Sequence, residues 1–117
     1  MSDAMRYHGG MAAEDAVARH YEAAGGAVLA TRCRTQAGEI DLIVQQADEV
    51  IFVEVKARKT HAAARLSLSE RQQRRILQAA ELWLAETGRS PLTPCRFDLA
   101  AVDAHGRIDI LHNILQP

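Results

Sequence analysis

Cysteine, aromatic residues and an excess of charge of either sign are all scarce in this 117-residue chain. Its two cysteines, Cys33 and Cys95, lack the spacing of a disulfide framework or a zinc site, so we expect free thiols in a reducing compartment. Aromatic residues make up 4% of the chain, too few for a single-strand binder that stacks bases on aromatic rings. The formal net charge of -1 excludes a globally basic protein, so any contact with nucleic acid must be local.

Long hydrophobic runs are also missing. No stretch approaches the ~18 consecutive apolar residues that a membrane-spanning helix needs, and the first residues lack the apolar core of a signal peptide. We therefore expect a cytoplasmic protein without membrane contact. The chain length suits one domain with one hydrophobic core. Residues 1–10 are polar and end in two glycines, which predicts a flexible N-terminal lead before a domain over residues 11–117.

The pattern of apolar residues predicts two helices and five strands. The predicted helices cover residues 11–24 and 67–88, and the predicted strands cover residues 27–34, 39–46, 50–57, 95–102 and 107–115. Both Ser67 with Glu70 and Ser69 with Gln72 fit a capping box at the start of the second helix. Residues 60–66 are predicted to form a mobile loop. The order α-β-β-β-α-β-β predicts an α/β protein with a mixed central sheet flanked by helices.

The hairpin of the second and third strands has a register that the hydrophobic pattern defines. A four-residue loop pairs Gln45 with Val50, and this places Asp41 opposite Glu54. One face of the hairpin is then entirely apolar and suited to burial. It carries Ile40, Leu42, Val44, Ile51, Val53 and Val55. The opposite face is apolar near the loop, at Ile43 and Phe52, and charged at the far end of the hairpin.

The charged end of this face carries Glu39, Asp41, Glu54 and Lys56. Opposed residues have Cβ atoms roughly 4.5 to 5.5 Å apart, so Asp41 and Glu54 could share one hard cation such as Mg²⁺, with the Val55 carbonyl as a further oxygen ligand. Lys56 could then orient water or stabilise charge on a phosphate. The same pattern is also typical of solvent-facing cross-strand ion pairs. Glu39 is accordingly either a member of the site or the ion-pair partner of Lys56.

Three short motifs carry a family resemblance. Gly38 to Ile43 read GEIDLI, Phe52 to Arg58 read FVEVKAR, and Arg96 to Asp98 read RFD. They resemble the bacterial YraN family, whose members are similar to Holliday-junction resolvases and belong to the PD-(D/E)xK nuclease superfamily. The resemblance runs from about residue 10 to residue 102. It implies a restriction-endonuclease-like fold.

The resemblance also implies roles for individual residues. Asp41 and Glu54 would be metal ligands, Lys56 the catalytic lysine, and Glu14 on the first helix an additional acid. The reaction would be hydrolysis of DNA phosphodiesters with Mg²⁺ or Mn²⁺, leaving a 5′-phosphate, and a homodimer is expected by analogy. An acid in the first turn of a helix is also favoured by the helix dipole, which would explain Glu14 equally well. Where relatives often carry Lys early in the second helix, this chain has Arg71, which keeps the charge.

Basic residues follow the predicted strand over residues 50–57 in a dense cluster, which we name the basic segment. It contains Arg58, Lys59, Arg65, Arg71, Arg74 and Arg75. Such a cluster could hold the phosphates on either side of a cut position, and the scarcity of aromatic residues favours duplex or branched DNA. The alternative is a solvated helix face without a ligand.

Three functions therefore compete. The first is a Mg²⁺-dependent DNA endonuclease, with selectivity for branched DNA by its resemblance to resolvases. The second is a non-catalytic nucleic-acid-binding or DNA-repair scaffold that keeps the fold. The third is an adaptor that binds another protein through its acidic face. The combination of Asp41, Glu54 and Lys56 favours the enzyme, because a scaffold has no evident need for buried charge.

Overall fold

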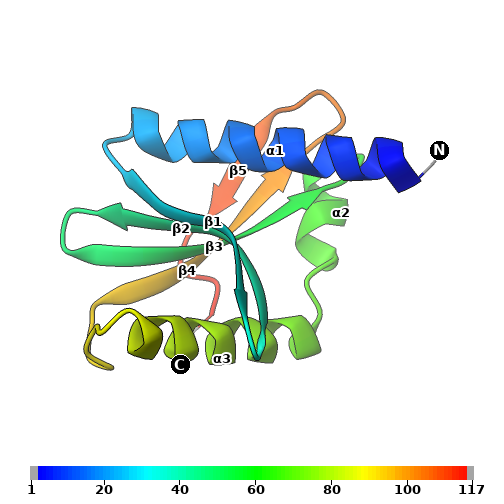
Figure 1. The fold of residues 1–117 in the computed structure, drawn as a ribbon. Helices are drawn as coiled ribbons and strands as arrows, with labels where there is room; N and C mark the ends of the chain where they lie inside the picture. The colour runs from blue at the N-terminus through cyan, green and yellow to red at the C-terminus, as the bar shows by residue number, and fades with distance from the viewer. Residues whose placement is uncertain (1–2, 116–117) are drawn as a thin grey trace.

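A five-stranded sheet in the order β1-β2-β3-β4-β5 forms the middle layer of the protein (Figure 1). The computed structural model describes residues 3–115, with side chains from residue 11 onward. The strands are β1 (Ala27–Thr35), β2 (Gly38–Gln46), β3 (Glu49–Ala57), β4 (Cys95–Val102) and β5 (Ile108–Leu111). The helices are α1 (Asp3–Ala23), α2 (His61–Leu66) and α3 (Glu70–Glu86). The predicted mixed α/β class and the order of the long elements are confirmed.

The strand directions follow from the connections. Strands β1, β2 and β3 form an antiparallel meander, and β5 pairs antiparallel with β4. Strands β3 and β4 are parallel, because the chain returns through α2 and α3 between them. Pairing of Gln45 with Val50 and of Ile43 with Phe52 confirms the predicted register of the β2-β3 hairpin as far as Leu42 and Val53. The ladder ends there, so the predicted strand pairs of Asp41 with Glu54 and of Glu39 with Lys56 do not form.

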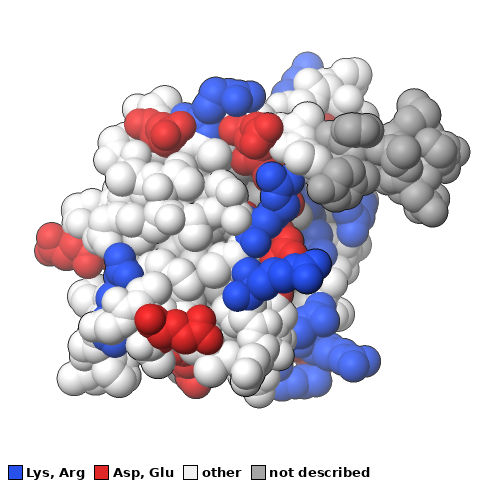
Figure 2. All heavy atoms as spheres, viewed as in Figure 1, with Lys and Arg blue, Asp and Glu red and all other residues white. Residues whose placement is uncertain are grey.

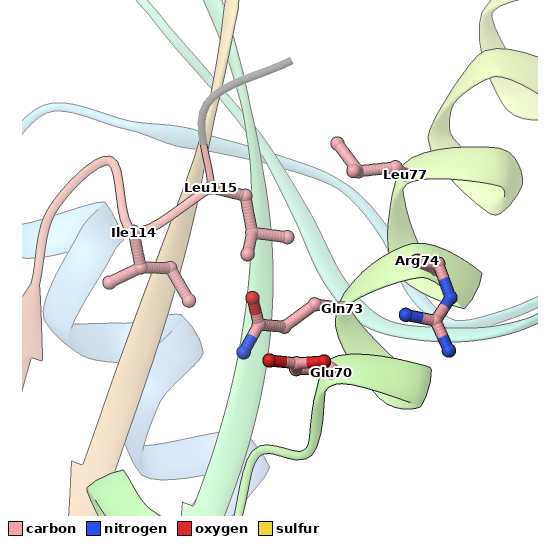
Figure 3. A pocket seen from close by; sticks show the side chains of 6 residues that line it. All are labelled: Glu70, Gln73, Arg74, Leu77, Ile114 and Leu115. Carbon is pink, nitrogen blue, oxygen red and sulfur yellow. The ribbon is translucent and has the colours of Figure 1, made fainter.

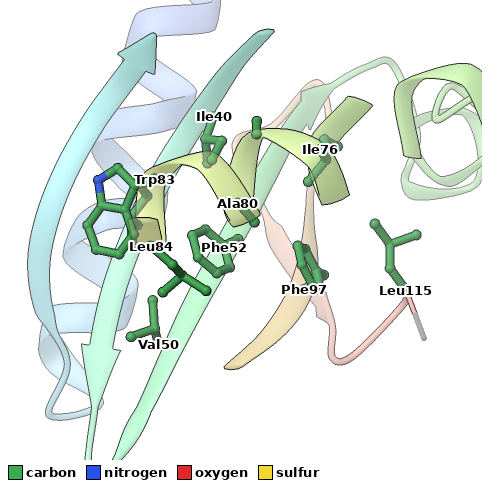
Figure 4. Packing of buried hydrophobic residues seen from close by; sticks show 11 residues of the cluster. Ile40, Val50, Phe52, Ile76, Ala80, Trp83, Leu84, Phe97 and Leu115 are labelled. Atoms are coloured by element: carbon green, nitrogen blue, oxygen red, sulfur yellow. The ribbon is translucent and has the colours of Figure 1, made fainter. Parts of the chain in front are cut away.

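Helix α3 covers one face of the sheet with an apolar stripe, and we call this layer the α3-side cluster (Figure 4). Phe52 lies at its centre, 5.8 Å from the Trp83 ring and 5.3 Å from the Phe97 ring, measured between centroids. The Ser69 capping box starts the helix: its hydroxyl accepts from the Gln72 N–H, and the Gln72 side chain accepts from the Ser69 N–H. One of the two predicted capping boxes is thereby confirmed.

Helix α1 covers the other face and forms the α1-side cluster. Its residues Ala13, Val17 and Tyr21 are spaced by four and pack against buried side chains of β2, β3 and β4. Helices therefore cover both faces of the central strands, while the edge strand β1 has exposed residues along its whole length. None of the helices within residues 3–115 is long and apolar enough to cross a membrane.

Ile40 lies on a different face from the one predicted. It packs in the α3-side cluster, whereas Leu42, Val44, Ile51 and Val53 pack in the α1-side cluster. Residues two apart in a regular strand share a face, so β2 must change face between Ile40 and Leu42. The prediction assumed an undisturbed alternation and is wrong for Ile40.

Three element boundaries also differ from prediction. Helix α1 begins at Asp3 rather than near residue 11. The helix includes Gly9 and Gly10, because a glycine costs a helix only about 1 kcal/mol and does not by itself end it. Residues 61–66 form α2 instead of a loop, because the Thr60 hydroxyl caps the helix by accepting from the Ala63 N–H. Strand β5 stops at Leu111, since Asn113 has a left-handed backbone with φ of 54°.

Asp98 on β4 is the one charged residue among the buried residues that the structure describes, and it joins three parts of the fold. Its carboxylate accepts from the Tyr21 hydroxyl at 2.7 Å, from the Arg96 Nε at 3.1 Å and from the Asn113 N–H at 3.0 Å. Burial alone would raise the pKa of Asp98, but these donors hold its pKa below the ordinary value. Asp98 thereby fixes α1 and the C-terminal segment to the sheet.

We predict that Asp98→Ala lowers the free energy of unfolding by about 3 kcal/mol, because Arg96 and Tyr21 would lose their shared buried partner. Chemical denaturation measures this change. The matched control is Asp109→Ala, which removes an ion pair with Arg65 whose side chains are 48% and 46% exposed and should cost less than about 1 kcal/mol. Equal losses in the two variants would contradict a structural role for Asp98.

Candidate functional site

The sheet divides between β2 and β3 at the predicted site. The two strands are paired from Gln46 and Glu49 up to Leu42 and Val53. Beyond that point β2 continues paired with β1 alone, and β3 continues paired with β4 alone. Figure 1 shows the tip of the β1-β2 hairpin bending toward α3, while β3 and β4 run away from it. We call the resulting gap the sheet fork.

Asp41 is the first residue of β2 beyond the paired region, and it faces the sheet fork. Its Oδ2 accepts a hydrogen bond from the Val55 backbone N–H at 2.9 Å. The side chain thus replaces a backbone acceptor that the departing strand no longer supplies. Both backbone groups of a residue in an extended strand point to one edge, so the Val55 carbonyl also faces the fork.

Glu54 and Lys56 line the β3 side of the sheet fork. The Glu54 carboxyl lies close to the Asp41 carboxyl, whose charge raises the pKa of Glu54, and Lys56 Nζ lies 3.5 Å from Glu54 Oε1. Their side chains are 15% and 11% exposed, so both are largely withdrawn from solvent while remaining accessible. The structure brings together the three residues at the centre of the predicted site.

Glu14 reaches the same centre from α1. Its side chain is 20% exposed, the charge of Asp41 raises its pKa, and Arg32 NH1 lies 3.8 Å from Glu14 Oε2. Glu14 is thus more than a first-turn acid: α1 begins well before it and directs it at the sheet fork. The rotation of α1 that achieves this is held two turns further on by the hydrogen bond from Tyr21 to Asp98.

Three carboxyl groups at one place disturb each other's ionisation. Burial, followed by the charge of Asp41, raises the pKa of Glu54 to about 8 and that of Glu14 to about 7. Burial also raises the pKa of Asp41, against the opposing effect of the Val55 N–H. The protein alone therefore does not supply enough positive charge for all three to ionise at neutral pH.

Two carboxylates and one backbone oxygen are the donors that the sheet fork could offer to a cation. Within the part of the chain that the structure describes, no group of three or more His, Cys, Asp or Glu side chains is placed to hold a metal ion by itself. Asp41, Glu54 and the Val55 carbonyl offer oxygen donors on one side only. Mg²⁺ suits such an arrangement, because it is commonly held by one or two carboxylates with water and substrate phosphate completing the shell.

Glu39 does not pair with Lys56, so that alternative is wrong. Its carboxylate lies 3.6 Å from Arg34 Nε, and its side chain is 40% exposed. The change of face at Asp41 separates Glu39 from the β3 strand that the extended register placed opposite it. Its charge still raises the pKa of Asp41 and Glu14, so it contributes to the negative potential from outside.

The basic segment lies on the surface beside the sheet fork. All six of its residues are exposed: Arg58, Lys59, Arg65, Arg71, Arg74 and Arg75. Figure 2 shows basic side chains gathered along one side of the molecule with an acidic patch between them, on the side where α2 and the start of α3 lie in Figure 1. The Arg75 stem packs over Gly38, where an added Cβ would come within 3.0 Å of it. Arg65 is engaged by Asp109 at 3.4 Å.

Two partly open pockets lie away from the carboxyl groups of Asp41 and Glu54. One, of about 270 Å³, lies between the start of α3 and the C-terminal segment and is lined by Glu70, Arg74 and Leu115 among others (Figure 3). The other, of about 440 Å³, is lined by residues such as Tyr21 and Arg96. The sheet fork is an open surface feature, which suits a large ligand better than a small enclosed one.

Sequence reasoning missed Arg32. It lies on β1 directly opposite Asp41, since its neighbours Thr31 and Cys33 pair with Leu42 and Ile40. Extending the hairpin register from β2 to β1 would have found it. The sequence around Arg32 is typical of an exposed strand, so no local motif identifies Arg32 as a site residue.

Comparisons with known proteins agree on one family. The model described as uncharacterised protein family UPF0102 matches residues 13–102. The chain belongs to the UPF0102 (YraN) family. A UPF0102 protein of Cereibacter sphaeroides is 51% identical over 113 residues, which cover 97% of each chain. A UPF0102 protein of Roseobacter denitrificans is 45% identical, covering 95% of this chain and 86% of the relative.

A third UPF0102 protein, from Azorhizobium caulinodans, is 41% identical and covers 92% of this chain and 82% of the relative. The family description names no activity. The matched region of this UPF0102 chain contains Glu14, Asp41, Glu54 and Lys56, so all four lie in the part that defines the family.

The ionisation of the sheet fork predicts a pH-dependent stability. Glu14 and Glu54 bind protons more tightly when folded, with pKa values of about 7 and about 8 against an ordinary 4.5, so their contribution falls as pH rises through this range. We expect the unfolding free energy of the wild type, minus that of the Glu14→Gln/Glu54→Gln variant, to decrease from pH 4.5 to pH 8.

The measurement is urea denaturation of both proteins at each pH, with and without Mg²⁺. Millimolar Mg²⁺ should recover the lost stability of the wild type at pH 8 and leave the variant unchanged, because the cation replaces protons among the carboxylates. A difference that stays constant with pH would contradict the raised pKa values.

Proposed function

We propose that this protein is a metal-dependent endonuclease that hydrolyses DNA phosphodiester bonds. The observation that carries the proposal is the pair of neighbouring, largely buried carboxyl groups of Asp41 and Glu54 at the sheet fork, with Lys56 Nζ 3.5 Å from Glu54 Oε1. Buried like charges are costly. Asp41 has a structural role as the acceptor for the Val55 N–H, but that role does not account for Glu54 and Lys56 beside it. The arrangement is explained by a cationic ligand and an anionic substrate meeting at this place.

Each residue has a distinct part in the proposed reaction. Asp41, Glu54 and the Val55 carbonyl would hold a divalent cation. When bound, such a cation polarises a phosphoryl oxygen and lowers the pKa of a bound water molecule. Lys56 would hold the attacking water or the charged phosphate through its Nζ. Glu14 would accept a hydrogen bond from water at the edge of the centre. Leu42 and Val53 keep the floor of the fork dry.

DNA is the proposed substrate because of the surface next to the sheet fork. The exposed Arg58, Lys59, Arg71 and Arg74 lie in the segments that follow the catalytic strand β3. They would contact phosphates along a duplex or a branched junction and give affinity with little sequence preference. This arrangement also distinguishes the proposal from an acidic protein-docking surface, which would not need a basic border.

We predict that the wild type cuts labelled linear, flapped or four-way-junction DNA only when Mg²⁺ or Mn²⁺ is present, and that Asp41→Asn and Lys56→Met lower the rate by about 100-fold or more. Gel analysis of cleavage products measures the rate and the end groups. Asp109→Asn, a carboxylate on β5 that pairs with Arg65, is the matched control and should cut like the wild type.

Thermal unfolding of every variant separates loss of chemistry from loss of fold. Cleavage by the wild type that persists in chelator, or that is unchanged in Asp41→Asn, would show that the sheet fork is not the catalytic centre. Binding of DNA without any cutting would favour the scaffold.

The basic segment predicts a salt-dependent affinity. Arg71→Ala and Arg74→Ala should each weaken DNA binding and reduce the slope of log affinity against log salt by about 1, since each removes one phosphate contact. Fluorescence anisotropy in chelator measures binding without cutting. Arg19→Ala on the exposed part of α1 is the control and should leave the slope unchanged. If all three variants behave alike, the basic segment is a solvated face only.

A further inference from the structure

Arg32 has an unusual backbone conformation for a residue inside a strand. Its φ is 46°, in the left-handed region, although it is a long-chain residue within the nine-residue strand β1. Residues other than glycine seldom adopt this conformation, and those that do gather at functional sites where the surrounding structure holds them. The position of Arg32 opposite Asp41 makes this observation specific to the sheet fork.

The conformation of Arg32 coincides with a change of face in both strands of the hairpin. Ala30 and Cys33 are three residues apart, yet both pack against the α3-side cluster. Ile40 and Ile43 on β2 show the same relation. In a regular strand, residues three apart point to opposite faces. Each strand therefore makes an extra half-turn at the level of Arg32 and Asp41, and this half-turn directs Arg32 toward Glu14 on α1.

The side chain of Arg32 makes an ion pair that contributes little to stability. Arg32 NH1 lies 3.8 Å from Glu14 Oε2, and the two side chains are 39% and 20% exposed. A long, half-exposed pair of this kind is typically worth ~1 kcal/mol or less in proteins, and it does not explain a strained backbone. Arg32 thus leaves a guanidinium accessible to solvent beside the carboxyl groups.

The two cations of the centre lie on opposite sides of Asp41 in the sheet. Lys56 is on β3 and Arg32 is on β1, with Asp41 on β2 between them. Lys56 is 11% exposed and held by Glu54, whereas Arg32 is the more accessible of the two. A phosphate group entering the sheet fork from solvent would meet Arg32 at its rim.

We propose that Arg32 is a phosphate-binding residue of this centre. Its ion pair with Glu14 and its left-handed backbone conformation position the guanidinium for this contact. The inference rests on the proposed function, since the phosphate is that of a nucleic-acid strand. A guanidinium can bind a phosphate through two parallel hydrogen bonds, which an ammonium cannot do. Glu14 releases the guanidinium when the phosphate arrives, and this leaves the Glu14 carboxylate available to water.

The test uses three substitutions. Arg32→Gly removes the guanidinium but retains a residue that adopts positive φ freely, so the hairpin keeps its half-turn. Arg32→Lys keeps the positive charge but lacks the two parallel N–H donors of the guanidinium. Arg34→Ala is the matched control, because Arg34 lies on the same strand, pairs with the peripheral Glu39 and is 89% exposed.

The expected results separate backbone from side chain. Arg32→Gly should unfold at or above the wild-type temperature, cut DNA about 100-fold more slowly with Mg²⁺, and show a salt slope of DNA binding in chelator lower by about 1. Arg32→Lys should keep the salt slope and recover only part of the rate. Arg34→Ala should cut at the wild-type rate.

Three distinguishable outcomes overturn the inference. If the wild type cuts DNA and Arg32→Gly cuts as fast as Arg34→Ala, Arg32 does not bind the phosphate and the proposed function stands. If the wild type neither binds nor cuts any nucleic acid, the proposed function and this inference fail together. If Arg32→Gly does not fold, Arg32→Lys decides, and a wild-type rate in that variant overturns the two-bond contact.

Discussion

The hydrogen bond from the Val55 N–H to the Asp41 carboxylate is the interaction on which the candidate site depends. Strands β2 and β3 stop pairing at this residue, and a strand that loses its neighbour exposes backbone donors. The carboxylate satisfies the first of these donors and so terminates the ladder. Because the ladder ends there, Glu54 and Lys56 are left facing a gap instead of a neighbouring strand.

The gap is held open by the packing of the residues on either side of it. The α3-side cluster takes Ile40 and the outer part of the β1-β2 hairpin, while the α1-side cluster takes Leu42 and Val53 at the last paired position. The two clusters thus draw neighbouring residues of β2 to opposite faces. Asp98 adds a third constraint, because its bond to Tyr21 sets the rotation of α1 and hence the direction of Glu14.

Much of the fold could be predicted from local patterns. Alternating apolar residues defined the five strands, and loop length defined the register that the structure confirms between Gln45 and Val50. Ser69 marked the start of α3. The prediction failed where a local signal was weak or overridden: the cap at Thr60 was overlooked, and the turn at Asn113 interrupted an apolar run that continued in sequence.

For the site, the sequence by itself determined that Asp41, Glu54 and Lys56 would share one end of a hairpin, because register follows from side-chain alternation and turn length. Only the tertiary structure decided that the strands separate there, that Glu14 joins from another layer, and that Arg32 faces the carboxylates. These features depend on contacts between segments distant in the chain and on one left-handed residue inside a strand. Neither has a signature in the pattern of neighbouring residues, so folding had to bring them together.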